Sequence, residues 1–379
     1  MKLLGINISH DTSVAQITDD TINFVFDEAR FRRHKYWDPH KLRDDDYGLQ
    51  CIAQRNVEKP DHLIFTTFDR RNIKFHADQQ NLVFDRLKSE EFCKDMRDQQ
   101  LSLVRLEELR DKYNGLFDFE FKTGADEIIC DTLSKQVFKD DEGYTLDCTQ
   151  HHLYHAECVH ALSPWKGEEC IAIVWDGGGA MRFFDTHPGY QEMETIFHCV
   201  PGKVPEIKWQ RLSNNRTLTD QGYMFPNLKY DCFMCWEDEV VDMNGTEIVF
   251  SSRPSSGQNF SQLSAAFQTD EEGRAAGKVM GMASYGTTRP NTFNQYTVAQ
   301  QCEEESLTNS LQIINKAKEL IPNTNKILLS GGYSLNCTNN YKYLEANPDH
   351  EFFVDPIPHD GGTALGGVLW LKRHLENTL

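Results

Sequence analysis

The stretch Cys170–Gly179, CIAIVWDGGG, decides the fold class. Its first six residues are apolar and predict a buried β-strand, and Asp176 follows at the end of that strand, ahead of glycines. Because glycine lets the backbone come close to a ligand, Asp176 with Gly177 and Gly178 could hold a metal ion or a phosphate group. A glycine-rich hairpin leading into Met181 would leave the same pattern, so both interpretations stay open at this point.

The same pattern, a predicted strand or a carboxylate followed by glycines, occurs twice more in the second half of the chain. Ser330–Gly332 follows the apolar run Lys326–Leu329 and precedes Asn336, and Asp360–Thr363 opens a predicted helix. Three strand-to-glycine turns in one chain predict a nucleotide whose phosphates lie against glycines. Neither the Walker pattern GxxxxGK[ST] nor the dinucleotide pattern GxGxxG occurs in the sequence.

Alternation of strands and helices predicts the α/β class. The spacing of Leu307, Leu311, Ile314 and Ile321 predicts an amphipathic helix over Ser306–Ile321. The predicted strands, the first three of which form a β-meander, are Lys2–Ile8, Ser13–Thr18, Thr21–Glu28, Cys170–Trp175, Met181–Phe184, Lys326–Leu329 and Glu351–Val354.

Two lobes sharing a cleft are expected, because no stretch rich in Pro, Gly and Ser divides the chain. We place them at residues 1–165 and 166–379. The stretch at about 202–257 carries Trp209, Trp236 and an acidic run, and it reads as irregular structure or as an insertion near a site.

The histidines of HHLYH, residues 151–155, are the strongest chemical signal. On a helix, His151 and His155 are at positions i and i+4, so both imidazoles leave the same face and can bind one metal ion. A pair of surface or core histidines would give the same spacing. A metal needs a third and harder ligand, and Asp176 and Asp360 are the candidates because each lies where a strand gives way to glycines.

The charge balance excludes some classes of protein. With 39 Lys and Arg against 58 Asp and Glu, the net charge is −19, which argues against a chain that coats nucleic acid and favours a small polar or cationic substrate. The basic cluster at residues 30–35 reads as a solvated face that could still contact a phosphate. No apolar run of about 18 residues and no signal-peptide core occurs, so we expect a soluble, cytoplasmic protein without membrane contact.

The cysteines fit a reducing compartment. Eleven are scattered along the chain without the regular pattern of a disulfide framework. One CxxC, Cys232 to Cys235, has the spacing of metal ligands, but no further Cys or His follows closely, and packed or solvated thiols are the plainer interpretation.

Six blocks together resemble a known family. They are GINISHDTS, HHLYHA, VWDGGGA, GKVMGMASYG, LLSGGYSLNC and HDGGTALGG, in that order over nearly the whole chain. The sequence resembles the O-carbamoyltransferases of the nodulation and antibiotic-biosynthesis type, which are related to the enzymes that make threonylcarbamoyladenosine in tRNA. The resemblance implies a two-lobed α/β fold of the actin, hexokinase and Hsp70 ATPase type, with ATP or carbamoyladenylate and an iron-type metal, Fe²⁺ or Mn²⁺.

The resemblance also implies roles for individual residues. An acceptor hydroxyl of a small molecule, sugar or nucleotide would attack carbamoyladenylate, made from ATP and carbamoyl phosphate, and AMP would leave. His10 would take the hydroxyl proton, and Lys35 would lie near the substrate. The implied metal ligands are His151, His155 and Asp360, with Asp176 at the metal or the phosphates; the implied nucleotide-facing residues are Asp176, Gly177, Gly178, Gly331, Gly332 and Asn336. Lys278, before an apolar run, could meet a phosphate or belong to the surface.

Some features depart from the family pattern. Ala180 stands where the family has an acidic residue, and Ser284 stands where it has proline. Full-length members usually continue into a domain that makes carbamoyladenylate, so we expect a donor made by a separate protein or formed in an unfamiliar way. Two alternatives remain: a small-molecule kinase or ATPase that forms ADP, and a non-catalytic nucleotide-binding subunit of a complex.

Overall fold

The computed structural model describes eleven stretches of the chain. These are residues 1–8, 11, 13–27, 60–68, 150–179, 181–182, 190–213, 238–251, 254–267, 275–286 and 294–378. The chain divides into two compact units: unit 1 comprises Met1–Cys158, Met181–Gly189 and Asp360–Leu379, and unit 2 comprises Val159–Ala180 and Tyr190–His359. The predicted lobe boundaries, 1–165 and 166–379, stay a prediction.

Unit 1 is built on a four-stranded sheet in the order β3-β2-β1-β4. Strands β1 (Lys2–Ile8), β2 (Ser13–Thr18) and β3 (Thr21–Asp27) are joined in antiparallel pairs, and β4 (His62–Phe68) lies parallel to β1. The predicted β-meander is confirmed. Its second turn places Asp19 at a φ of 51°, a left-handed conformation that aspartate tolerates better than most residues.

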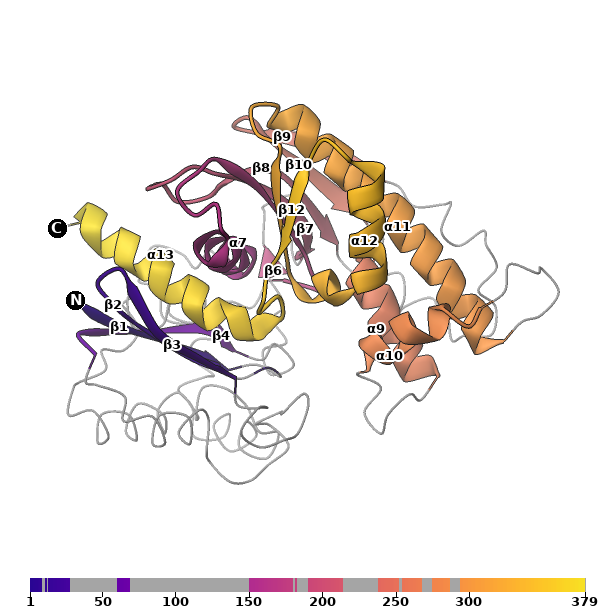
Figure 1. Cartoon of the computed structure of the whole chain (residues 1–379), viewed down its shortest axis with the longest axis horizontal. Coiled ribbons are helices and arrows are strands. Elements are labelled where there is room, and N and C mark those ends of the chain that lie inside the picture. The colour runs from indigo at the N-terminus through magenta and orange to yellow at the C-terminus, as the bar shows by residue number, and fades with distance from the viewer. Residues whose placement is uncertain are drawn as a thin grey trace, which may run out of the picture. The chain divides into compact units, whose positions relative to one another are not determined.

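Helix α13 (Thr363–Thr378) covers this sheet and packs on β1, β2 and β4, as Figure 1 shows. The contact is close because glycines remove side chains from it. A Cβ built on Gly5 of β1 would lie 2.2 Å from the carbonyl oxygen of Ala364, and one on Gly366 would lie 1.8 Å from the carbonyl oxygen of Tyr154. Tyr154 belongs to helix α7 (Gln150–Leu162). The backbones of α13, α7 and β1 therefore touch directly.

Unit 2 contains a longer mixed sheet, whose main path runs β12-β11-β5-β7-β8-β10-β9. The bounds of its strands are β5 Cys170–Trp175, β7 Tyr190–Cys199, β8 Glu206–Ser213, β9 Asp238–Met243, β10 Thr246–Ser251, β11 Lys326–Ser330 and β12 Glu351–Val354. Strands β12, β11 and β5, at one end of this path, are mutually parallel, and every residue of β5 is buried. The predicted β5, β11 and β12 are thus confirmed to within one residue. The short strand β6 covers Met181–Arg182.

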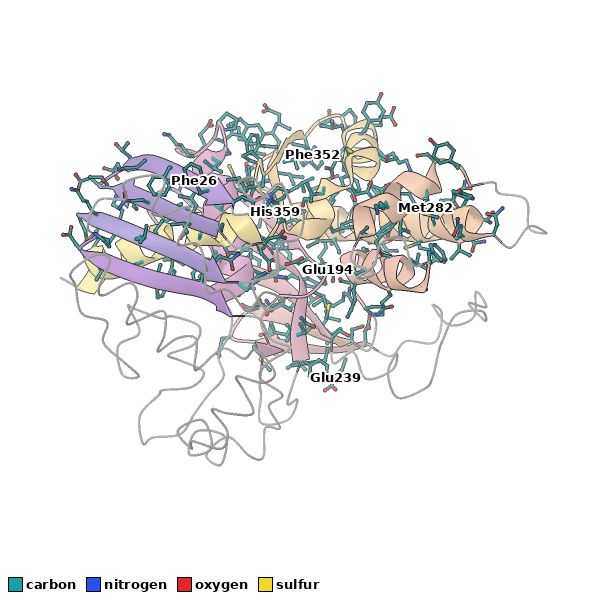
Figure 2. All side chains as sticks on the ribbon, turned by 90° about the horizontal axis from the view of Figure 1, so that it is seen from below. Phe26, Glu194, Glu239, Met282, Phe352 and His359 are labelled. Carbon is teal, nitrogen blue, oxygen red and sulfur yellow. The ribbon has the colours of Figure 1, made fainter. Side chains whose placement is uncertain are left out.

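Helices cover the sheet of unit 2. Figure 1 shows α11 and α12 beside the sheet. Helices α9 and α10 lie together near one end of α11 (Figure 1). Their bounds are α9 Ser256–Ala266, α10 Ala276–Ala283, α11 Gln295–Leu320 and α12 Cys337–Ala346. Trp175, Phe260, Ile314, Leu329 and Tyr343 lie in their shared core. In Figure 2 the label of Met282 marks α10, and that of Glu239 marks the edge strand β9.

Two sequence-based predictions for unit 2 are wrong in detail. The helix predicted over Ser306–Ile321 begins earlier, at Gln295, because the side chain of Asn294 accepts a hydrogen bond from the backbone N–H of Thr297 and caps it. The stretch 202–257 is not irregular where the structure describes it, because it forms β8, β9, β10 and the start of α9. Whether it is an insertion relative to the family stays a prediction.

In the described ranges, no helix combines the length and the apolar character that crossing a bilayer requires.

We predict that Gly366→Ala destabilises the protein by about 1 to 3 kcal/mol, because the new methyl group would collide with the backbone of α7. Urea unfolding followed by circular dichroism measures the loss. Gly281→Ala on α10 is the matched control: it is also a helical glycine, but a Cβ there meets nothing within 4 Å, so stability should hold or rise by up to about 1 kcal/mol. Equal effects of the two substitutions would contradict the prediction.

Candidate metal centre and glycine turns

The two histidines of the HxxxH motif lie side by side on α7. His151 and His155 are both buried, and their ring centroids are 5.0 Å apart. The stretch is helical, as binding of one metal ion by both histidines requires, and one helical turn brings both rings to the same face. Helical spacing therefore supplies two nitrogen ligands without any loop having to move.

A carboxylate from unit 1 completes the cluster. Asp360 lies in the short 3₁₀ helix η5 (Asp360–Gly362), and its Oδ1 is 3.5 Å from Nε2 of His151 and 4.0 Å from Nε2 of His155. The ligand atoms of the three residues all lie within 4.8 Å of one another. Thr363 donates a 2.6 Å hydrogen bond to the carbonyl oxygen of Asp360 and fixes the start of α13 behind it.

These residues fit a divalent metal ion. Metal bonds of about 2.1 Å place neighbouring ligand atoms about 3 to 3.5 Å apart, close to the separations between Asp360 and the two histidines. Two neutral imidazoles and one carboxylate form the donor set that suits a non-haem Fe²⁺ ion, and Mn²⁺ accepts the same ligands. The cluster is thus able to hold the metal that the family resemblance implies.

A buried ion pair joins α7 to α13 next to this cluster. Arg373 of α13 donates to Oε2 of Glu157 at 2.8 Å, and Glu157 is fully buried. Burial raises the pKa of Glu157 to about 7, although the guanidinium of Arg373 acts in the opposite direction. The pair and the contact of Gly366 with Tyr154 together hold the helix that carries the histidines.

In unit 2 the structure brings two of the predicted glycine turns together. Oδ1 of Asp176 accepts hydrogen bonds from the backbone N–H of Gly177 at 2.6 Å and of Gly332 at 3.4 Å. Gly331 has a φ of 87°, and a Cβ on it would lie 2.2 Å from the carbonyl oxygen of Trp175. Only glycine fits this position, because any side chain would meet the backbone at the end of β5.

A third segment, the start of α9, also lies at these turns and was not predicted from the sequence. The hydroxyl of Ser255 donates to the carbonyl oxygen of Gly177 at 3.2 Å and accepts from the N–H of Gln258 at 2.9 Å, which caps the start of α9. A Cβ on Gly257 would lie 2.9 Å from the backbone nitrogen of Gly177. The residues PSSG before a helix could have indicated a capped helix start, but nothing in the sequence indicates that it lies on the turn of Asp176.

Asn336 is engaged within the protein. Its Nδ2 donates to Oε2 of Glu303 at 2.8 Å, and its Oδ1 accepts from the N–H of Asn339 at 3.2 Å, capping α12. Burial raises the pKa of Glu303. The hydrogen bond from Asn336 and the charge of Lys342 lower that pKa, but by less, so the net shift is upward. The expected contact of Asn336 with a nucleotide stays a prediction. Lys278 is an exposed residue of α10, and a role on a phosphate stays a prediction for it too.

Several predicted residues lie outside the part of the chain that the structure describes. These are His10, Lys35, the remainder of the basic cluster at residues 30–35, Ala180, Cys232 and Cys235. His151, His155 and Asp360 come together in unit 1, and Asp176, Gly177 and Gly332 come together in unit 2.

Comparison with known proteins identifies the family. The sequence profile described as "Carbamoyltransferase N-terminus" matches residues 2–305. The chain therefore belongs to the carbamoyltransferase family, as its six blocks predicted. A search of curated protein sequences returns no match.

Solved structures align with the chain at low identity. HypF from T. kodakarensis has a TM-score of 0.49 at 12% identity, over 99% of this chain and 48% of that one. Full-length HypF in a phosphate- and nucleotide-bound form has a TM-score of 0.44 at 14% identity, over 99% and 55%. A ROK family glucokinase from Streptomyces griseus, crystallised with glucose and AMPPNP, has a TM-score of 0.39 at 10% identity, over 98% and 99%.

The chain thus spans about half the length of the HypF chains. The predicted α/β class is confirmed by the strands and helices of the chain itself.

We predict that His151→Ala and His155→Ala each weaken binding of Mn²⁺ or Co²⁺ by more than about 100-fold, the upper end of what loss of a supporting contact costs at a metal site. Isothermal titration calorimetry measures the affinity. His198→Ala is the control, because His198 pairs with Glu169 at 2.6 Å in unit 2 and should leave binding unchanged. Binding that survives both α7 substitutions would exclude this cluster as the metal site.

We also predict that Glu303→Gln stabilises the protein at pH 8 and that this gain shrinks as the pH falls. A carboxyl whose folded pKa is raised binds more protons in the folded state, so its contribution is present at low pH and is lost as the pH rises through that pKa. Urea unfolding at several pH values measures the difference. Glu319→Gln, at an exposed position of the same helix, should show no such trend. A gain that is independent of pH would contradict the assignment.

Proposed function

We propose that the chain transfers a carbamoyl group from carbamoyladenylate to a hydroxyl group of a small molecule, sugar or nucleotide. The observation that carries this proposal is the cluster of His151, His155 and Asp360, with ligand separations that fit a divalent ion. Membership of the carbamoyltransferase family supplies the group that is transferred. The reaction of a sugar kinase does not require a metal ion bound by two histidines at this spacing. The cluster therefore favours the transferase over the kinase.

The reaction forms one bond and breaks another. The acceptor oxygen attacks the carbamoyl carbon, and the bond from that carbon to the phosphate oxygen breaks, so that AMP leaves with the bonding electrons. His10 takes the proton of the acceptor hydroxyl, since imidazole titrates near neutral pH. Lys35 lies near the substrate in this scheme.

The chain's own residues hold the reactants. Asp176, Gly177, Gly178, Gly331 and Gly332 form the turns that would receive the phosphate through backbone N–H groups. Asn336 and Lys278 complete this proposed nucleotide site. In this proposal His151, His155 and Asp360 would hold Fe²⁺ or Mn²⁺, and Asp176 would act at the metal or at the phosphates. The bound ion would supply positive charge to the leaving phosphate.

The proposed carbamoyl donor, carbamoyladenylate, must be made by another reaction. Carbamoyladenylate comes from ATP and carbamoyl phosphate, and we propose that a separate protein can supply it. The proposed reaction takes place in the cytoplasm, on small soluble molecules, without direct contact with nucleic acid or membranes.

Product analysis tests the function. The protein is loaded with Fe²⁺ or Mn²⁺ and given freshly made carbamoyladenylate labelled in the carbamoyl group, together with a panel of sugars, nucleotides and amino sugars. We expect AMP and a labelled carbamate ester on one acceptor. We expect His10→Asn to lower kcat by about 10²- to 10⁴-fold, the usual contribution of a general base.

A second arm replaces the adenylate by ATP and labelled carbamoyl phosphate. AMP with pyrophosphate would show that the chain makes its own donor, whereas no reaction in this arm alone would assign that step to a separate protein. Formation of ADP, with phosphate transferred to the acceptor, would identify a kinase instead. If the supplied adenylate is bound but never transferred, the chain is a non-catalytic subunit and the proposal fails.

A further inference from the structure

The first hairpin of unit 1 closes on two buried polar residues. Asn7 is near the end of β1 and Ser13 begins β2, and the two are direct partners in the antiparallel register. Both are fully buried. The turn between these strands carries His10, which lies outside the described residues. Buried polar side chains next to a hairpin turn require hydrogen-bond partners within the protein, because an unmade hydrogen bond is costly away from water.

Both side chains donate to the turn that carries Asp360. Nδ2 of Asn7 donates to the carbonyl oxygen of Asp360 at 3.0 Å, and the hydroxyl of Ser13 donates to the next carbonyl oxygen, that of Gly361, at 2.7 Å. Nδ2 of Asn7 also donates to the carbonyl oxygen of Asp11 at 2.8 Å. One cross-strand pair thus holds two successive peptide groups of η5, and it ties the first turn to them.

The turn at Asp360 depends on such support. Asp360 is followed by Gly361 and Gly362, and glycine has more backbone freedom than any other residue. A carboxylate at the head of a glycine pair would therefore sample many positions unless its backbone were held from outside. The hydrogen bonds from Asn7 and Ser13 restrict this freedom at Asp360 itself and at the residue that follows it.

We propose that Asn7 and Ser13 are positioning residues that fix Asp360 in the geometry for metal binding. This inference rests on the proposed metal centre and adds to it two supporting residues from β1 and β2. Neither side chain is within the set of metal ligands; each acts through the backbone of η5. Asn7 also donates to the carbonyl oxygen of Asp11, so it joins Asp11 to the backbone of Asp360.

The test is metal binding by the full chain, measured without any substrate. Asn7→Ala, Ser13→Ala and the double variant are titrated with Co²⁺, and both affinity and the visible absorption bands of the bound ion are recorded. We expect each single variant to lose about 10- to 100-fold in affinity, as supporting contacts at metal sites do, with altered bands that report changed coordination. The double variant should lose less than the product of the two single losses, because both residues hold the same turn.

Asn347→Ala separates positioning from a general loss of stability. Asn347 is a buried asparagine of unit 2 that donates to the backbone carbonyl of Tyr343 at 2.9 Å, so its removal costs the same kind of bond. We expect it to lower the unfolding temperature as Asn7→Ala does, and to leave Co²⁺ affinity and absorption unchanged.

The outcomes distinguish this inference from the metal centre itself. If the unaltered chain binds no Co²⁺, or binds it undiminished after His155→Ala, the metal centre is wrong and the positioning role falls with it. If the unaltered chain binds through His155 while Asn7→Ala and Ser13→Ala bind with the same affinity and bands, the metal centre stands and only the positioning role is refuted. Loss of affinity in Asn347→Ala equal to that in Asn7→Ala would also refute it.

Discussion

Direct backbone contact between α7 and α13 is the constraint on which unit 1 depends. The carbonyl oxygen of Tyr154 lies where the Cβ of any residue but glycine at position 366 would be. Tyr154 is between the two histidines of the metal cluster, and Asp360 precedes α13. The distance from the histidines to the carboxylate is therefore set by how closely two helices approach, and the ion pair of Glu157 with Arg373 holds the same two helices together.

In unit 2, glycines likewise allow direct contact between backbones, here at the ends of strands. Gly331 lies against the carbonyl oxygen of Trp175, and Gly257 lies against the backbone of Asp176 and Gly177. Because side chains are absent at these contacts, the ends of β5 and β11 and the start of α9 come within hydrogen-bond distance of one another. In both units, then, glycine serves to bring backbones together as well as to leave room for a ligand.

The polar side chains around these contacts are mostly engaged with backbone. Asn7, Ser13 and Ser255 each donate to a carbonyl oxygen of a turn that holds a candidate site residue. Asn336 differs, because its Nδ2 donates to the side-chain carboxylate of Glu303 while its Oδ1 caps α12. Such bonds contribute modestly to stability, at about 1 kcal/mol each, but they define one conformation for glycine-rich turns that would otherwise have many.

The sequence by itself determined the local features. The apolar run Cys170–Trp175 and the strand-like runs at the start of the sequence predicted strands to within about one residue, because the tendency of a short apolar stretch to form a buried strand is encoded locally. Helical spacing placed His151 and His155 on one face, and the glycine turns left Asp176 and Asp360 as candidates for a third ligand. The start of α11 was missed because Asn294, an ordinary cap residue, lies before a polar stretch with no apolar stripe.

Only the tertiary structure decided which segments meet. Asn7 and Ser13 lie some 350 residues from Asp360 in sequence, and Ser255 lies 78 residues from Gly177. Nothing in their local pattern distinguishes them from other polar residues of strands and helix starts. Their partners are backbone carbonyl groups, which every residue carries, so no sequence motif records the pairing. Contact between distant segments depends on how the whole chain buries its apolar surface, and that is a property of the fold and not of any one stretch.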